Sequence, residues 1–209
     1  ETDCMEQFTL LAWIAAVTST IRVMTSVIVI PHRNPVFMAK SLATTDVLSG
    51  GRVTVGCGAG WMPEEFEALN LPPFASRGQV TNEYIDVMKA CWIDPNPSYD
   101  GEFFKFANVD TDPRPVQDPH PPIYMSVSSP EAGEFAAKNR INAGFAFTTL
   151  QIASKAADFY RDRCREYGWK PEPEQIVYRI GMHCANSDDE AIDDLTQTGG
   201  GQPAVGLAF

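Results

Sequence analysis

The sequence predicts an α/β protein built on a parallel β-sheet. Apolar, β-branched segments alternate with amphipathic helical segments, which implies right-handed βαβ units. The run at residues 21–30 is nearly continuously apolar and stops at Pro31, which is typical of a strand buried on both faces of such a sheet. A hydrophobic content of 44% with 21% charged residues predicts one soluble domain, over residues 1–209. Periodicity leaves both an open doubly wound sheet and a closed barrel possible.

In the first part of the chain, each expected element has a local signal. Phe8, Leu11, Ala12 and Ala15 share one helical face. A second helix has an N-cap at Asn34 and ends near residue 48, where glycines follow. The expected elements are a helix over 5–19, a strand over 21–30, a helix over 34–48 and a strand over 52–58.

The rest of the chain continues the alternation after an inserted hairpin. Val80, Tyr84 and Cys91 mark a helix, Asp100-Gly101 predicts a hairpin turn, and five prolines make residues 113–122 an extended connector. The further expected elements are strands over 123–127, 141–148 and 176–185, helices over 130–139 and 152–167, and a last helix capped by Ser187.

Composition narrows the classes of function. A net charge of -11 disfavours nucleic acid as a partner. The early apolar stretch at residues 10–17 is too short to span a membrane, and no basic segment precedes it, so we expect a soluble, cytoplasmic protein. The five cysteines are dispersed without zinc-binding spacing, which predicts reduced, mostly buried thiols and no metal site.

Several blocks, in order and spacing, resemble the bacterial luciferase-like flavin monooxygenases. They are IVIPHRNP (28–35), LSGGR (48–52), GCGAGW (56–61), EEFEAL (64–69), PVQ (115–117), HPPIY (120–124) and SSPE (128–131). The resemblance implies a (β/α)8 TIM-barrel fold, here incomplete, with about five of eight strands and an inserted hairpin. It also implies that two strands and the family's acid/base histidine lie upstream and one strand downstream, so the catalytic residue is unknown.

The glycines at 56, 58 and 60 follow a strand, where missing side chains would let backbone approach a ligand. The resemblance implies that Gly58 and Ala59 lie at the edge of a flavin. A structural tight turn is the alternative, and a dinucleotide loop is disfavoured because Trp61 stands where that motif needs glycine. The family's luciferase branch carries an arginine in place of Ala59, which argues against luciferase chemistry itself.

A phosphate site is expected from three residues. Ser128 and Ser129 precede Pro130 at a helix start, where free N–H groups favour an anion, although a plain N-cap serine would give the same pattern. The resemblance places the phosphate of FMN there, together with Arg77, whose planar donor group suits phosphate oxygens.

Three further residues are candidates for contact with the flavin ring. Thr25 and Ser26 interrupt an apolar strand, so their polar groups need partners. The resemblance implies a cis peptide between Ser26 and Val27 beside the flavin. Phe147, near the end of a strand, could pack beside the ring or simply in the core. His32 follows a strand end and could be a base, although a loop role is the more common one.

The resemblance predicts an FMN-dependent monooxygenase of a small organic substrate, which uses oxygen and externally reduced flavin. A flavin reductase and a second copy of the chain are the expected protein partners. One alternative is a hydride-transfer oxidoreductase that uses a deazaflavin coenzyme. Another is a non-catalytic flavin-binding protein with a shortened barrel.

Overall fold

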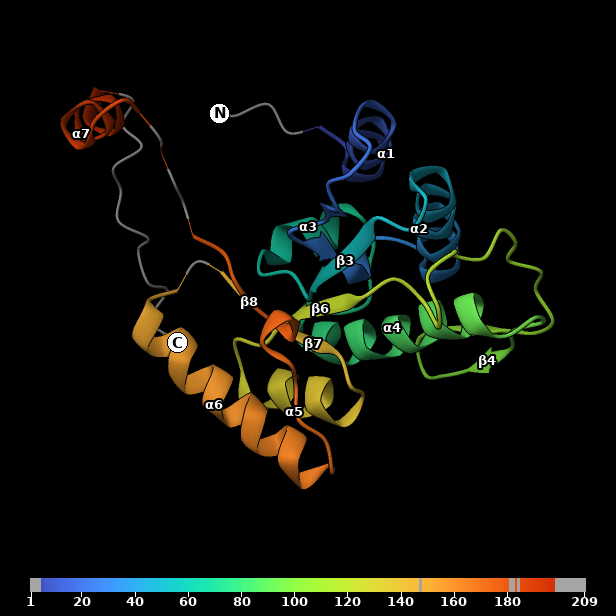
Figure 1. Ribbon diagram of the computed structural model, residues 1–209. Coiled ribbons are helices and arrows are strands. Elements are labelled where there is room, and N and C mark those ends of the chain that lie inside the picture. The colour runs from blue at the N-terminus through green and yellow to red at the C-terminus, as the bar shows by residue number, and fades with distance from the viewer. Residues whose placement is uncertain (1–4, 147, 181–182, 184, 198–209) are drawn as a thin grey trace. The chain divides into compact units, whose positions relative to one another are not determined.

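The computed structural model describes residues 5–146, 148–180, 183 and 185–197. The chain forms two compact units, Glu1–Met125 and Ser126–Phe209, and strands alternate with helices in both (Figure 1). In the described part of the chain, no helix has the length and apolar character needed to cross a bilayer.

The first unit contains a parallel sheet centred on β3. Its elements are α1 (Gln7–Val17), β1 (Val23–Met24), β2 (Ile28–Val29), η1 (Ile30–His32), α2 (Pro35–Ser49), β3 (Val53–Gly58), α3 (Pro63–Ala68), η2 (Phe74–Ser76), α4 (Arg77–Ile93), β4 (Tyr99–Asp100), β5 (Lys105–Phe106) and β6 (Ile123–Ser126), which reaches the boundary. Both β1 and β2 pair with one side of β3, and β6 pairs with the other. All six residues of β3 are buried.

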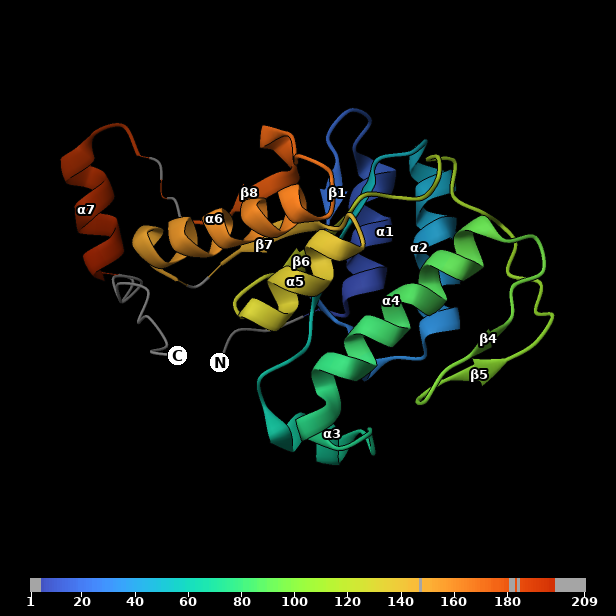
Figure 2. The ribbon, with the colours of Figure 1, turned by 90° about the horizontal axis from the view of Figure 1, so that it is seen from below.

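The helices of the first unit pack in chain order, α1 against α2 and α2 against α4 (Figure 2). The predicted ends of α2 are confirmed. Asn34 accepts hydrogen bonds from two first-turn N–H groups, and Gly50 follows the helix in the left-handed conformation with φ 67°. The Trp92 indole of α4 donates to the Ala39 carbonyl of α2 at 2.9 Å, which satisfies a polar group in this apolar contact.

The predicted strand over residues 21–30 is wrong in two respects. It is divided into β1 and β2, and Met24 and Ser26 are exposed, so its first half is buried on one face only. The physical reason is the side chain of Thr25. Its hydroxyl accepts from Gly56 N at 2.9 Å and donates to Gly56 O at 3.0 Å, so a side chain takes over the pairing with β3.

The hairpin and the proline connector are both present where the sequence predicts them. The hairpin β4–β5 lies beside α4 (Figure 2), where the Glu83 carboxylate accepts from the N–H groups of residues 102–104. The connector has no regular structure, but it is tied to α2 by the fully buried Asp46. That carboxylate accepts from the N–H groups of Val116 and Gln117 at 2.9 and 3.1 Å.

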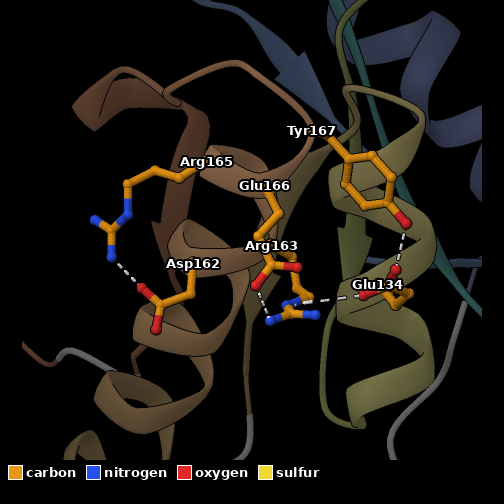
Figure 3. Close-up of polar contacts among 6 residues, drawn as sticks. All are labelled: Glu134, Asp162, Arg163, Arg165, Glu166 and Tyr167. Carbon is orange, nitrogen blue, oxygen red and sulfur yellow. Dashed lines mark hydrogen bonds and ion pairs between the residues drawn. The ribbon is translucent and has the colours of Figure 1, made fainter.

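The second unit pairs two parallel strands and packs two helices together. Its elements are α5 (Pro130–Lys138), β7 (Asn142–Phe145), α6 (Leu150–Glu166), η3 (Pro173–Gln175), β8 (Ile176–Tyr178) and α7 (Asp188–Gln197). The Tyr160 hydroxyl of α6 donates to the Ile141 carbonyl at 2.8 Å. Arg163 of α6 lies between Glu134 of α5 and Glu166, and Tyr167 donates to Glu134 (Figure 3).

Two predicted strands of this unit are shorter than expected. The strand expected over 141–148 is β7, and the strand expected over 176–185 is β8, which ends at Tyr178. The backbone of Arg179 donates to the Phe145 carbonyl at 2.8 Å, just past the paired residues of β7 and β8. A strand extends only as far as its partner does, so apolar sequence alone overestimated the length of both strands. The prediction for α7 is confirmed, since Ser187 caps it by accepting from Glu190 N.

Candidate functional site

The carboxyl ends of β1, β2 and β3 bring several expected site residues into one region of the first unit. Parallel strands end at the same edge of a sheet, and βα loops at that edge carry the sites of this fold class. The Ser26–Val27 peptide is cis, as the resemblance implied. The Val27 carbonyl accepts from Gln7 Nε2 of α1 at 2.8 Å. Sequence reasoning missed Gln7, because a polar residue in the first turn of a helix is unremarkable.

The three glycines of this region lie against the neighbouring strand segment. A Cβ on Gly56 would lie 2.0 Å from the Thr25 carbonyl oxygen, and one on Gly58 would lie 2.7 Å from Val27 Cγ2. Gly60 has φ +85°, which suits a tight turn. The packing of two strand segments therefore accounts for Gly56 and Gly58. Contact of Gly58 and Ala59 with a flavin stays a prediction.

His32 is packed between residues of α3. Its side chain is only 13% exposed, with Nε2 at 3.7 Å from Glu65 Oε2. Its ring meets Phe66 edge to face at a centroid distance of 5.4 Å. Burial lowers the pKa of His32, the Glu65 carboxylate raises it, and the Arg33 guanidinium lowers it. The ring is packed against Glu65 and Phe66, and this packed position favours the loop role over the role of a base.

Replacing Glu65 with glutamine is expected to lower the pKa of His32 further, because the neighbouring carboxylate is what favours the imidazolium. The measurement is an NMR titration of the histidine ring protons. The His120 signal is the internal control, since burial also lowers its pKa but its partners are Pro121 and Lys89. An unchanged or raised pKa of His32 would contradict the geometry.

Because the pKa of His32 is lowered in the folded protein, the free energy of unfolding depends on pH. The unfolded chain takes up the proton near the ordinary pKa of 6.5, and folded His32 resists it. The stabilising contribution is therefore present above this pH and is lost as the pH falls through the lowered pKa.

Arg77 is the first residue of α4 and carries an available positive charge. Its Nη1 donates to the Phe74 carbonyl at 3.2 Å, and its guanidinium lies 4.1 Å from the centroid of the Phe74 ring. Among the residues that the structure describes, no carboxylate lies within ion-pair distance of it. Ser76 makes no side-chain cap, and a Cβ on Gly78 would meet open space. The guanidinium of Arg77 and the first N–H groups of α4 are therefore donors that suit an anion.

In the second unit, Ser129 caps α5 as predicted, since its hydroxyl accepts from Ala132 N at 3.3 Å. Ser128 and Ser129 are both exposed. Hydrogen bonds from its own backbone N–H and from the Ser129 hydroxyl hold the pKa of the Glu131 carboxyl below its ordinary value. This helix start thus attracts negative charge. The combination of both serines with Arg77 in one phosphate site stays a prediction, and Phe147 lies outside the described residues.

A groove of about 440 Å³ adjoins the region, between α3 and the segment that leads from it to η2. Its lining residues are Pro63, Phe66, Glu67, Asn70, Leu71, Pro72, Pro73 and Phe74. Phe66 also packs against His32, and Phe74 also stacks with Arg77. The sequence did not predict α3 as a helix, although it begins with proline and two glutamates, which are favourable helix-start residues.

The fold and these residues define the class of protein. The chain belongs to the luciferase-like monooxygenase family, whose sequence profile matches residues 1–205. The predicted fold class, an incomplete (β/α)8 barrel, is confirmed by similar solved structures. Monooxygenase RslO1 from Streptomyces bottropensis superposes with a TM-score of 0.85 at 27% identity, over 92% of this chain and 59% of that one.

Among curated proteins, this chain is 33% identical over 135 residues to the FMNH2-dependent dimethylsulfone monooxygenase of Pseudomonas putida, covering 64% of this chain and 37% of that protein. It is 29% identical over 186 residues to the oxygenase component of the flavin-dependent trigonelline monooxygenase of Acinetobacter baylyi, covering 87% and 51%. An uncharacterised protein of Mycobacterium tuberculosis is 42% identical over 117 residues, covering 56% and 41%. The chain thus spans about half or less of the length of these relatives.

Proposed function

We propose that this chain is part of an FMN-dependent monooxygenase that oxygenates a small organic substrate with externally reduced flavin. The observation that carries the proposal is the free charge of Arg77 at an uncapped helix start. An FMN phosphate is a doubly charged anion, two oxygens of which can accept parallel hydrogen bonds from one guanidinium, so it suits Arg77 better than a neutral ligand does. The FMNH2-dependent relative supports FMN as the cofactor, and the trigonelline relative, named as flavin-dependent, supports a flavin.

Different residues of this chain would contact different parts of FMN. Arg77 would bind the phosphate, with Ser128 and Ser129 as further donors. Thr25 and Ser26 would flank the ring, with the backbone at Gly58 and Ala59 along its edge and Phe147 beside it. Reduced FMN supplies the electrons with which oxygen is activated. The barrel would exclude water from that chemistry.

The test is a fluorescence titration of the purified chain with FMN, riboflavin and a deazaflavin coenzyme. We expect FMN to be quenched at lower protein concentration than riboflavin, because only FMN carries the phosphate. Tight binding of the deazaflavin with none of FMN would reverse the proposal in favour of hydride transfer. One structure of the same fold, at 20% identity, is an F420-dependent secondary alcohol dehydrogenase.

A non-catalytic flavin-binding protein is the second candidate, and it is favoured by the packed position of His32, which is the one histidine near these strand ends among the described residues and lies against Glu65 and Phe66. Stopped-flow oxidation of reduced FMN separates the two candidates. Oxidation by oxygen at the rate of free flavin, with FMN bound, would support the binding protein. A flavin reductase and a second copy of this chain remain the expected partners.

A further inference from the structure

Phe74 holds the guanidinium of Arg77 through two contacts. Its ring lies 4.1 Å below the guanidinium carbon, and its carbonyl accepts from Nη1 at 3.2 Å. Both contacts come from η2, directly before the helix that Arg77 begins. One residue thus restrains both the plane of the guanidinium and one of its five donors.

The ring of Phe74 is itself held in place by its neighbours. Phe66 meets it edge to face, with centroids 5.2 Å apart and an angle of 88° between the rings. Phe66 is only 3% exposed and meets His32 in the same manner at 5.4 Å. His32, Phe66, Phe74 and Arg77 therefore form a continuous series of contacts, two edge to face and the last with the guanidinium over the Phe74 ring. The buried ring of Phe66 thus packs against the half-buried ring of Phe74, on which the half-buried Arg77 lies.

A free arginine side chain has many rotamers, and an anion that binds it must order them. An arginine already fixed by an aromatic ring has lost that freedom beforehand, so more of its attraction for the anion remains. The ring also favours the cation directly, through its quadrupole. In addition, the bond from Nη1 to the Phe74 carbonyl leaves the other donors of the guanidinium for a ligand.

We propose that Phe74 is a positioning residue, which pre-orients Arg77 for the phosphate of FMN. This inference rests on the proposed function, because it needs Arg77 to bind that phosphate. It adds the residue that determines how strongly the site distinguishes FMN from riboflavin. Loss of the stack should weaken FMN binding roughly threefold to tenfold, with riboflavin affinity unchanged.

The experiment compares the dissociation constants of FMN and riboflavin for the full chain and for Phe74→Leu and Phe74→Tyr. We expect leucine to weaken FMN binding selectively, and tyrosine to restore it, because tyrosine keeps the aromatic face. The matched control is Phe159→Leu, which removes an arginine–phenylalanine stack of 5.5 Å from α6. It should leave the affinities for both ligands unchanged.

The outcomes distinguish failure of the positioning role of Phe74 from failure of the proposed FMN site at Arg77. If the unmodified chain does not prefer FMN to riboflavin, the phosphate site itself fails, and the role of Phe74 with it. If the chain prefers FMN and folded Phe74→Leu keeps that preference, or loses affinity for both ligands equally, only the positioning role is overturned.

A second variant covers the case in which Phe74→Leu does not fold. Arg77→Lys keeps the charge but lacks the planar group that stacks on Phe74. It should show a selective loss for FMN of similar or larger size, and an unchanged preference for FMN would overturn the inference.

Discussion

Replacing Arg77 with glutamine is expected to weaken FMN binding by about tenfold to a hundredfold and to leave riboflavin binding unchanged. A hydrogen bond to a charged partner contributes about 1.5–3 kcal/mol, and each 1.4 kcal/mol is a factor of ten in affinity. Glutamine keeps a polar side chain but loses the charge and the donor fork. Fluorescence titration with both ligands measures the effect.

Arg161→Gln is the matched control for this prediction. Arg161 is also a helical arginine, but it forms an exposed ion pair with Asp158 on α6 and is not among the residues proposed to contact the ligand. Such pairs contribute little, so its variant should bind FMN as the unmodified chain does. Equal losses in the two variants would mean that overall charge, and not a site at Arg77, attracts FMN.

Replacing Gly56 with alanine is expected to destabilise the fold by about 3 kcal/mol or more, which is a fall in the thermal unfolding midpoint of roughly 6 to 12 °C. The new Cβ would lie 2.0 Å from the Thr25 carbonyl oxygen, a backbone atom that cannot rotate away. Relief would separate the segment around Thr25 from β3 and break both bonds of its hydroxyl. Circular dichroism during heating measures the midpoint.

Gly78→Ala is the control for the same chemical change. It adds a methyl group within α4, where nothing lies within 4 Å, and alanine is the better helix former. The midpoint should stay the same or rise. A Gly56→Ala variant as stable as Gly78→Ala would show that β3 and the Thr25 segment are not packed as described.

The helices of this protein were largely predictable from its sequence, because their signals are local. Asn34 with Pro35 begins α2, Gly50 ends it, and Ser187 caps α7, each through bonds within a few residues. The hairpin that follows Asp100 was predicted from a local signal too, the Asp100-Gly101 turn. The strands were predicted in order but not in extent, since a strand ends where its partner ends.

The candidate site was also predictable only in part from the sequence. The family resemblance was enough to predict the cis peptide after Ser26, and the alternation of elements was enough to predict an α/β fold. The phosphate role that the resemblance gives to Arg77 and Ser129 stays a prediction. Only the tertiary structure decided that Thr25 bonds to Gly56, 31 residues away, that Asp46 holds the proline connector, and that Phe74 stacks on Arg77. These features depend on which distant residues meet in space, and a local pattern of polar and apolar residues does not contain that information.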